Sequence, residues 1–275
     1  MYLEHFGLSE LPFGITPDTS YTVITRSHQE ALNTLLVAIG SGEGFIKITG
    51  EVGTGKTLLC RRLLQAMPEN AVSAYLPNPY LSPRTLLLAL AEELALAVST
   101  DVDDYHLLKQ INRALLEHAA AERRVVLCID EAQAMPLETL ESLRLLSNLE
   151  TEKRKLMQII LLGQPELDAK LSEPSIRQLL QRIAFHYKLT GLDHQEVGKY
   201  LEHRLRVAGY RGEGIFQPRT VRALHRASRG TPRLLNILAH KSLLAAYGEG
   251  LHAVKPVHVK RAAADTEGAS SPGWW

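Results

Sequence analysis

The sequence has few cysteines and no long apolar run. Only Cys60 and Cys128 occur among 275 residues, and both lie inside apolar segments, so a disulfide framework is excluded and a reducing compartment is expected. No run reaches the roughly 18 apolar residues that a membrane-spanning helix needs. The first residues also lack the basic and apolar regions of a secretory signal peptide. These absences predict a cytoplasmic protein, for which attachment to a membrane would need a partner or a missing extension.

An excess of charge of one sign is also lacking. Lys and Arg number 31 against 30 Asp and Glu, which gives a formal net charge of +1. No overall field therefore attracts nucleic acid or anionic lipid, and we find no strong nucleic-acid signal in the sequence. The apolar share of 45 % and the charged share of 22 % are ordinary for soluble globular proteins, so a well-buried core is expected.

Strands and helices are expected to alternate through the first two thirds of the chain. Short apolar runs predict strands at 45–49, 71–76, 125–129, 156–162 and 183–189. Helical spacing predicts helices at 29–39, 56–66, 83–98, 107–120 and 137–149. This alternation predicts an α/β fold with a parallel five-stranded sheet. Residues 1–30 are predicted to be an irregular lead-in anchored by Phe6 and Phe13.

The strand pattern ends near residue 190 and only helices follow. They are predicted at 193–207, 218–227, 232–247 and 255–264. We therefore expect a nucleotide-binding domain over 1–190, a small all-helical domain over 191–265 and a flexible tail over 266–275. The tail ends in Trp274-Trp275, which is either an interfacial aromatic pair ahead of a membrane span or the natural end.

The segment Gly50-Glu-Val-Gly-Thr-Gly-Lys-Thr57 fits the phosphate-binding pattern G-x-x-x-x-G-K-[ST] between a predicted strand and a predicted helix. Glycines let the loop turn its N–H groups toward phosphate, and the helix N-terminus adds partial positive charge. Lys56 is expected to hold the β- and γ-phosphates of ATP, and Thr57 to ligate Mg²⁺. The predicted nucleotide-binding residues are Gly50, Glu51, Val52, Gly53, Thr54, Gly55, Lys56, Thr57 and Leu58. The alternative is a chance glycine turn, which the strand and helix on either side disfavour.

Two acids, Asp130 and Glu131, directly follow the buried strand predicted at 125–129. Asp130 is expected to hold Mg²⁺ beside the phosphate loop. Glu131 is the candidate general base, because hydrolysis needs a carboxylate that orients the attacking water. Standing alone, such a pair would be a helix N-terminus with favourable dipole contacts. The phosphate loop earlier in the chain favours the catalytic role.

Two further polar residues are candidates for contact with the nucleotide. Gln164 follows the strand predicted at 156–162 and is expected to contact the γ-phosphate or the attacking water; otherwise it begins a turn before Pro165. Arg233 would oppose the helix dipole in the first turn after Thr231 and Pro232, so we expect the γ-phosphate as its anion.

A trans-acting arginine finger is sought in the segment Ser175 to Ile183. Arg177 and Arg182 are both candidates, and both could instead be solvated helix charges. We favour Arg182, because it directly precedes the last predicted strand and would project from the domain rim toward a neighbouring subunit.

Five motifs together resemble the ExeA-type AAA+ ATPases of bacterial secretion and pilus assembly. They are Gly50 to Thr57, Ile129-Asp-Glu-Ala-Gln133, Gly163-Gln-Pro-Glu166, Gln181-Arg-Ile183 and Gly230-Thr-Pro-Arg233. The opening segment Tyr2 to Phe13, followed by Thr16-Pro17-Asp18, also matches, so the resemblance covers residues 1 to 265. Within the family the chain most resembles the branch that serves mannose-sensitive haemagglutinin pilus biogenesis.

The resemblance implies a P-loop NTPase of the AAA+ type, an αβα sandwich followed by a helical lid. It also implies ATP and Mg²⁺ as cofactors, a homo-oligomer with a hexamer as one candidate size, and partners in pilus or secretion machinery. The main alternative is a DNA-directed AAA+ ATPase of the transposition-helper or replication-initiator kind, and the near-neutral charge speaks against it. A nucleotide-gated scaffold with very slow hydrolysis is a third hypothesis, and the presence of Glu131 argues against it.

Overall fold

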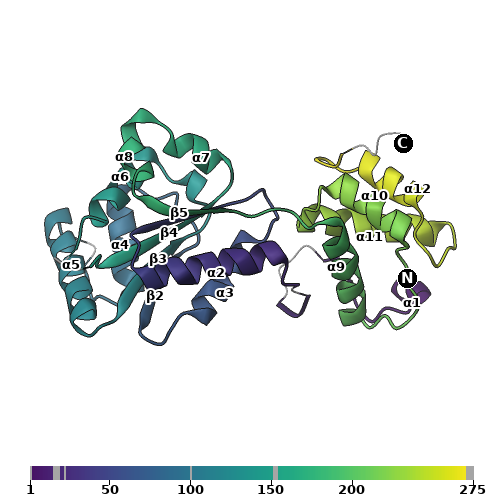
Figure 1. Cartoon of the computed structure of the whole chain (residues 1–275), viewed down its shortest axis with the longest axis horizontal. Helices are drawn as coiled ribbons and strands as arrows, with labels where there is room; N and C mark the ends of the chain where they lie inside the picture. The colour runs from purple at the N-terminus through teal and green to yellow at the C-terminus, as the bar shows by residue number, and fades with distance from the viewer. Residues whose placement is uncertain (1, 15–18, 22, 100, 151–153, 271–275) are drawn as a thin grey trace. The chain divides into compact units, whose positions relative to one another are not determined.

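The chain forms two compact units in the computed structural model, which describes residues 2–14, 19–21, 23–99, 101–150 and 154–270 (Figure 1). The sheet unit comprises His28–Glu51 and Gly55–Leu189, and the helical unit comprises Met1–Ser27, Val52–Thr54 and Thr190–Trp275. The lead-in therefore groups with the helical unit, whereas we expected it with the sheet. The Thr16-Pro17-Asp18 motif and the Trp274-Trp275 pair lie outside the described residues.

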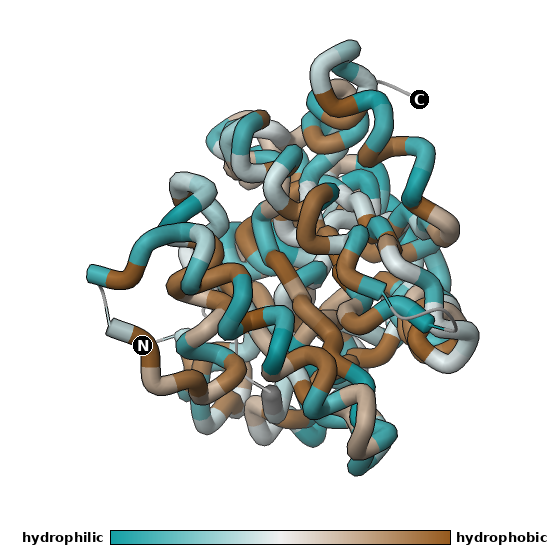
Figure 2. The backbone as a smooth tube through the Cα atoms, turned by 90° about the vertical axis from the view of Figure 1, so that its left-hand side faces the viewer, coloured by the Kyte–Doolittle hydropathy of each residue, from teal (hydrophilic) through white to brown (hydrophobic). Residues whose placement is uncertain are grey.

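A five-stranded sheet is the centre of the sheet unit. Its strands are β1 Phe45–Thr49, β2 Ala71–Leu76, β3 Arg124–Ile129, β4 Met157–Gly163 and β5 Ile183–Lys188. Their order is β2-β3-β4-β1-β5, and every neighbouring pair is parallel, which confirms the predicted sheet. Every residue of β1 and β4 is buried, because helices cover both faces of a parallel sheet. In Figure 2, brown marks the hydrophobic segments of the chain, which alternate with teal hydrophilic segments along the tube.

Helices cover both faces of the sheet in the sheet unit. They are α2 Arg26–Ser41, α3 Lys56–Ala66, α4 Pro83–Glu93, α5 Asp104–Ala120, α6 Leu137–Leu146, α7 Glu166–Leu171 and α8 Arg177–Leu180. α2 and α3 pack on the face that carries Ile46, Ile48 and Cys128. α4, α5, α6 and α7 pack on the other face, against Leu127 and Leu161. The alternation of side chains along each strand therefore supplies two separate hydrophobic cores.

Two predicted helices end earlier than expected. α4 stops at Glu93 rather than residue 98, because Ala95 adopts a left-handed conformation with φ 56°. The Leu96 N–H then donates to Ala91 O and the Ala95 N–H to Glu92 O, which satisfies the last carbonyls of the helix. α6 ends at Leu146 rather than residue 149, where the Ser147 hydroxyl bonds Arg144 O at 2.7 Å. Such closing bonds leave little trace in the hydrophobic periodicity.

The helical unit is built from α1 Tyr2–Phe6, α9 His194–Val207, α10 Pro218–Ser228, α11 Pro232–Gly248 and α12 Pro256–Ala264. The prediction of an irregular opening was wrong for Tyr2–Phe6, which forms a short helix with both aromatic ends buried. Arg204 of α9 explains why the lead-in packs here: its Nε donates to Pro12 O at 2.6 Å, and its guanidinium lies 4.7 Å from the Tyr21 ring centre. Among the described residues, no helix is long and apolar enough to cross a bilayer.

Gly163 lies at the end of β4, where the surrounding side chains leave no room for a Cβ. A Cβ there would lie 2.8 Å from Leu167 Cδ2 and 3.1 Å from Gln133 Oε1. We expect Gly163→Ala to lower the free energy of unfolding by about 1–3 kcal/mol, as overpacking of a core does. Urea unfolding measures this. Gly40→Ala is the control, because nothing lies within 4 Å of that Cβ, and equal losses in the two variants would contradict the packing argument.

Candidate active site

The predicted site residues meet at the carboxyl-end edge of the sheet. β4 lies between β3 and β1, so the ends of these three strands are neighbours. The predicted phosphate-binding loop follows β1, Asp130 and Glu131 follow β3, and Gln164 follows β4. In open α/β sheets, ligands bind outside the carboxyl ends of the strands, where crossovers diverge to the two faces.

Lys56 is the first residue of α3, and its ammonium lies inside the loop that precedes the helix. Its Nζ donates to Gly50 O at 2.8 Å and to Glu51 O at 3.2 Å. Burial lowers the pKa of Lys56, while the charges of Glu131 and Asp130 act in the opposite direction. Gly55 turns the chain into the helix with φ 94°, and a Cβ at Gly55 would lie 2.6 Å from His28 Nε2. The loop thus holds a buried cation at a helix N-terminus, where phosphate is favoured.

The two predicted Mg²⁺ ligands are in direct contact. Thr57 Oγ1 donates to Asp130 Oδ2 at 2.6 Å, and Asp130 Oδ1 accepts the Glu131 N–H at 2.9 Å. Mg²⁺ is held in proteins by one or two oxygen ligands together with waters and substrate phosphates, so this hydroxyl and carboxylate fit it. Among the described residues, no three His, Cys, Asp or Glu side chains gather into a metal-binding group. The donors supplied by the chain therefore suit a metal that arrives with a nucleotide.

Glu131 accepts two amide hydrogen bonds on one carboxylate oxygen. Gln164 Nε2 donates to Glu131 Oε2 at 3.0 Å, and Gln133 Nε2 donates to the same oxygen at 2.5 Å. Burial alone would raise the pKa of Glu131, but these hydrogen bonds and the charge of Lys56 outweigh it and lower the pKa. Glu131 itself lies in a left-handed conformation, with φ 52° and ψ 36°. Such backbone strain in a non-glycine residue clusters at functional sites.

Gln133 is a site residue that our sequence reasoning did not assign. Its Oε1 accepts the Gln164 N–H at 3.0 Å, so one side chain ties the ends of β3 and β4 together. Lys170 of α7 fixes the same turn by donating to Gln133 O at 2.6 Å and Met135 O at 2.8 Å. The signal in the sequence was its place in the motif Ile129-Asp-Glu-Ala-Gln133, to which we gave no role for Gln133. Its hydrogen-bond partners depend on the order of the strands, which the motif does not encode.

Removal of the Gln133 amide is expected to change the acid limb of the pH profile. Gln133→Ala loses a hydrogen bond that stabilises ionised Glu131, so the pKa of Glu131 should rise. ATP turnover that needs ionised Glu131 would then start to fall at a higher pH than in the wild type. Turnover measured between pH 4 and 8 tests this. Gln178→Ala, at an exposed position on α8, should leave the profile unchanged, and an unshifted profile in Gln133→Ala would contradict the expectation.

The candidate arginines are Arg177, Arg182 and Arg233, and the first two lie in the sheet unit. Arg182 Nη1 donates to Ser147 Oγ at 2.7 Å, a contact within the sheet unit, and Arg177 is exposed at the start of α8. Arg233 lies in the first turn of α11 in the helical unit. Gly53 groups with the same unit, and a Cβ on Gly53 would lie 2.4 Å from the Arg233 Cβ. The roles of Arg182 and Arg233 stay predictions.

The remaining predicted loop residues differ in their exposure. Val52 and Glu51 are exposed, Thr54 is buried, and Leu58 is half-buried in the first turn of α3. Because Glu51 already contributes its backbone carbonyl to Lys56, its side chain need not take part. The roles of Val52, Thr54 and Leu58 in nucleotide binding stay predictions.

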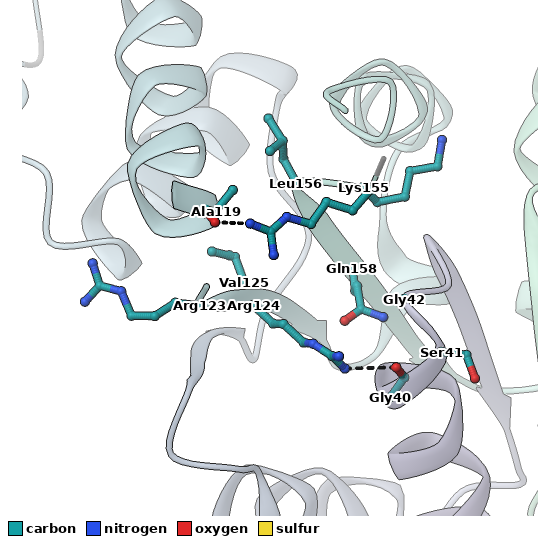
Figure 3. Close-up of a pocket in the computed structure, with 11 residues that line it drawn as sticks. Gly40, Ser41, Gly42, Ala119, Arg123, Arg124, Val125, Lys155, Leu156 and Gln158 are labelled. Carbon is teal, nitrogen blue, oxygen red and sulfur yellow. Dashed lines mark hydrogen bonds between the residues drawn. The ribbon is translucent and has the colours of Figure 1, made fainter. Parts of the chain in front are cut away.

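A cavity of about 210 Å³ lies at the opposite edge of the sheet, where β3 and β4 begin (Figure 3). Its cationic lining residues are Arg123, Arg124, Arg154 and Lys155. Arg124 Nη1 donates to Ile39 O at 2.7 Å and Gly40 O at 3.1 Å, and Arg154 donates to Ala119 O. These carbonyl groups belong to the last turns of α2 and α5. The two arginines therefore donate hydrogen bonds to carbonyls at helix C-termini, where a positive charge is favourable. The cavity is therefore separate from the site at the carboxyl ends.

Residues 39–171 match the family described as an AAA domain. The chain is 43 % identical over 275 residues to general secretion pathway protein A of Aeromonas hydrophila, and it spans 50 % of that protein's length. Among solved structures it is similar to the Aeropyrum pernix ORC2 protein, with 19 % identity and a TM-score of 0.64 over 95 % of this chain and 72 % of that one. Cdc6p from Pyrobaculum aerophilum matches with 19 % identity and the same score over 91 % and 71 %. At these identities the structural likeness shows the fold alone, which is a P-loop AAA-type fold.

Proposed function

Since the chain carries an AAA domain and is related over its whole length to general secretion pathway protein A, we propose that it binds and hydrolyses ATP with Mg²⁺. The observation that carries the proposal is the contact between Thr57 and Asp130 beside Lys56 and Glu131. A cation, a hydroxyl and two carboxylates near one another support the proposal, because phosphoryl transfer needs a phosphate-binding cation, metal ligands and a group that orients water.

The residues of the chain divide the chemical work. Lys56 offers its ammonium to the phosphates, and Thr57 with Asp130 would hold Mg²⁺, which when bound neutralises phosphate charge. Glu131 stays ionised because its pKa is lowered, so it can accept a hydrogen bond from the attacking water and orient it. Gln164 and Gln133 keep that carboxylate in position. The geometry thus supports in-line attack by water on the γ-phosphate.

The cellular task that we propose is assembly or remodelling of a type IV pilus or type II secretion-like machine. Support comes from the 43 % identity to general secretion pathway protein A and from the motif resemblance. Mannose-sensitive haemagglutinin pilus biogenesis is the finer assignment within this proposal, and it rests on the motif resemblance alone. The chain spans half of that relative's length. Its partners in the machine and its location at the inner membrane are therefore also proposals.

Turnover of ATP across a protein concentration series tests the proposed ATPase. We expect turnover per subunit to rise with concentration, because the working form is a homo-oligomer in which one subunit supplies an arginine to the next. The assay measures phosphate release in the presence of Mg²⁺. Chelation of Mg²⁺ should abolish turnover, and turnover that persists without Mg²⁺ would contradict the roles of Thr57 and Asp130.

Arg182 is proposed as the arginine that a neighbouring subunit supplies. Arg182→Ala should lose ATP turnover and regain it when mixed with Glu131→Gln, which keeps Arg182 and lacks its own base. The mixture should approach a fraction of wild-type turnover that depends on the mixing ratio. Arg177→Ala, mixed in the same way, is the control for the other candidate. Absence of complementation at every ratio would remove Arg182 as a trans-acting residue.

A further inference from the structure

Three exposed arginines lie on α10 of the helical unit, and a fourth directly follows the helix. We call Arg219, Arg222, Arg226 and Arg229 the arginine face; all four are exposed. The spacing of three and four residues places the first three on one side of the helix, and Arg229 is the C-cap residue, with φ 50°. The opposite side carries Val221, Leu224 and Ala227, which are buried in the core of the unit. The fold therefore orients all four guanidiniums outward.

The arginine face has no acidic counterpart. Among the described residues, none of its four guanidiniums pairs with a carboxylate, and α10 contains no Asp or Glu. Arg229 Nε donates to the neutral Ser270 Oγ at 2.7 Å, which leaves its charge uncompensated. Residues 190–270 hold 13 Lys and Arg against seven Asp and Glu, although the whole chain carries only +1. Ordinary protein surfaces carry positive and negative charges side by side. This local excess of positive charge therefore favours an anionic partner.

The geometry of the row matches a polyphosphate backbone. A rise of about 1.5 Å per residue puts Arg219 and Arg226 about 10 Å apart along the helix, and Arg229 follows at its C-terminal end. Each strand of duplex DNA carries one phosphate per about 3.4 Å of axis, so such a row can reach several successive phosphates. Guanidinium groups bind phosphate oxygens in a bidentate fashion, which a lysine ammonium does not. We propose that the arginine face binds the phosphate backbone of duplex DNA without sequence preference.

Two other anionic partners fit the arginine face less well. An amphipathic helix that binds lipid needs its apolar side for the bilayer, whereas the apolar side of α10 is already packed in the core. A protein interface usually has an apolar or aromatic centre, yet none of the exposed large hydrophobic residues of the described chain lies on α10. A positively charged surface without exposed large hydrophobic residues is better suited to bind a uniformly negative polymer. This binding activity goes beyond the proposed ATP hydrolysis and does not depend on it.

Fluorescence anisotropy with a labelled random-sequence duplex of about 30 base pairs tests the proposal, because binding falls with salt in proportion to the phosphates contacted. We expect the logarithm of the association constant to fall against the logarithm of salt concentration with a slope of about −3 to −4. The triple variant R219A/R222A/R226A should lose most of that slope and bind at least about tenfold more weakly at low salt. Arg226→Glu alone should reduce the slope by one or more.

A matched triple variant controls for the loss of charge as such. K109A/R113A/R206A removes three exposed cations that lie off α10, and it should keep the wild-type slope. An equal loss in both triple variants, or no binding by the wild type, would overturn the proposal. Association with phosphatidylserine vesicles but not with duplex would overturn it in favour of a membrane surface. Basal ATP turnover of R219A/R222A/R226A is expected to be unchanged, so failure of the DNA proposal and failure of the ATPase proposal remain distinguishable.

Discussion

Glu131→Gln is expected to bind ATP normally and to hydrolyse it about 10²- to 10⁴-fold more slowly, the range that a general base contributes. The substitution keeps the shape of the side chain and retains an oxygen that can accept a hydrogen bond from Gln164 or Gln133. It removes the ionised oxygen that would orient water. Single-turnover phosphate release measures the chemical step, and a fluorescent ATP analogue measures binding.

Glu138→Gln is the matched control for this experiment. Glu138 is exposed in the first turn of α6, seven residues beyond Glu131, so its loss removes the same charge without touching the network. Turnover in Glu138→Gln should stay close to that of the wild type. Retained turnover in Glu131→Gln would show that another group orients the water, and Gln164 would then be the next residue to test.

Lys56→Ala is expected to weaken ATP binding by about 10- to 150-fold, because a hydrogen bond to a charged group contributes about 1.5–3 kcal/mol. The cation would be missing from the phosphate loop, and Gly50 O and Glu51 O would lose their donor. Thermal unfolding with and without ATP measures the effect. A ligand at a hundred times its dissociation constant stabilises the native state by about 2.7 kcal/mol, and a 10- to 150-fold weaker affinity should remove roughly half to nine tenths of that gain.

The control for Lys56→Ala is Lys109→Ala, which removes an exposed cation from α5. It should show the full stabilisation by ATP. Lys56→Ala and Glu131→Gln should then differ in kind, since the first loses binding and the second loses only turnover. Equal stabilisation of Lys56→Ala and wild type by ATP would remove Lys56 from the phosphate site.

Elements with strong local signals were predictable residue by residue. The bounds of β1, β2 and α3 are those expected. Residues next to the element indicate such bounds, as where Gly50 ends the apolar run of β1 or the glycine loop precedes α3. Thr57 and Asp130, which we predicted separately as Mg²⁺ ligands, are hydrogen-bonded to each other, although β4 lies between the strands that precede them. Local pattern failed at Ala95, where a left-handed turn ends α4 without glycine.

The sequence by itself thus determined the parallel α/β fold, the phosphate loop and the acids that follow β3, because each depends on neighbours within about ten residues. Tertiary structure alone decided the role of Gln133, the partner of Arg182 and the place of the lead-in. Those depend on contacts such as Gln164 to Gln133, Arg182 to Ser147 and Arg204 to Pro12, which join residues 31, 35 and 192 positions apart. A hydrogen bond across such a separation is set by strand order and packing, which no local pattern encodes.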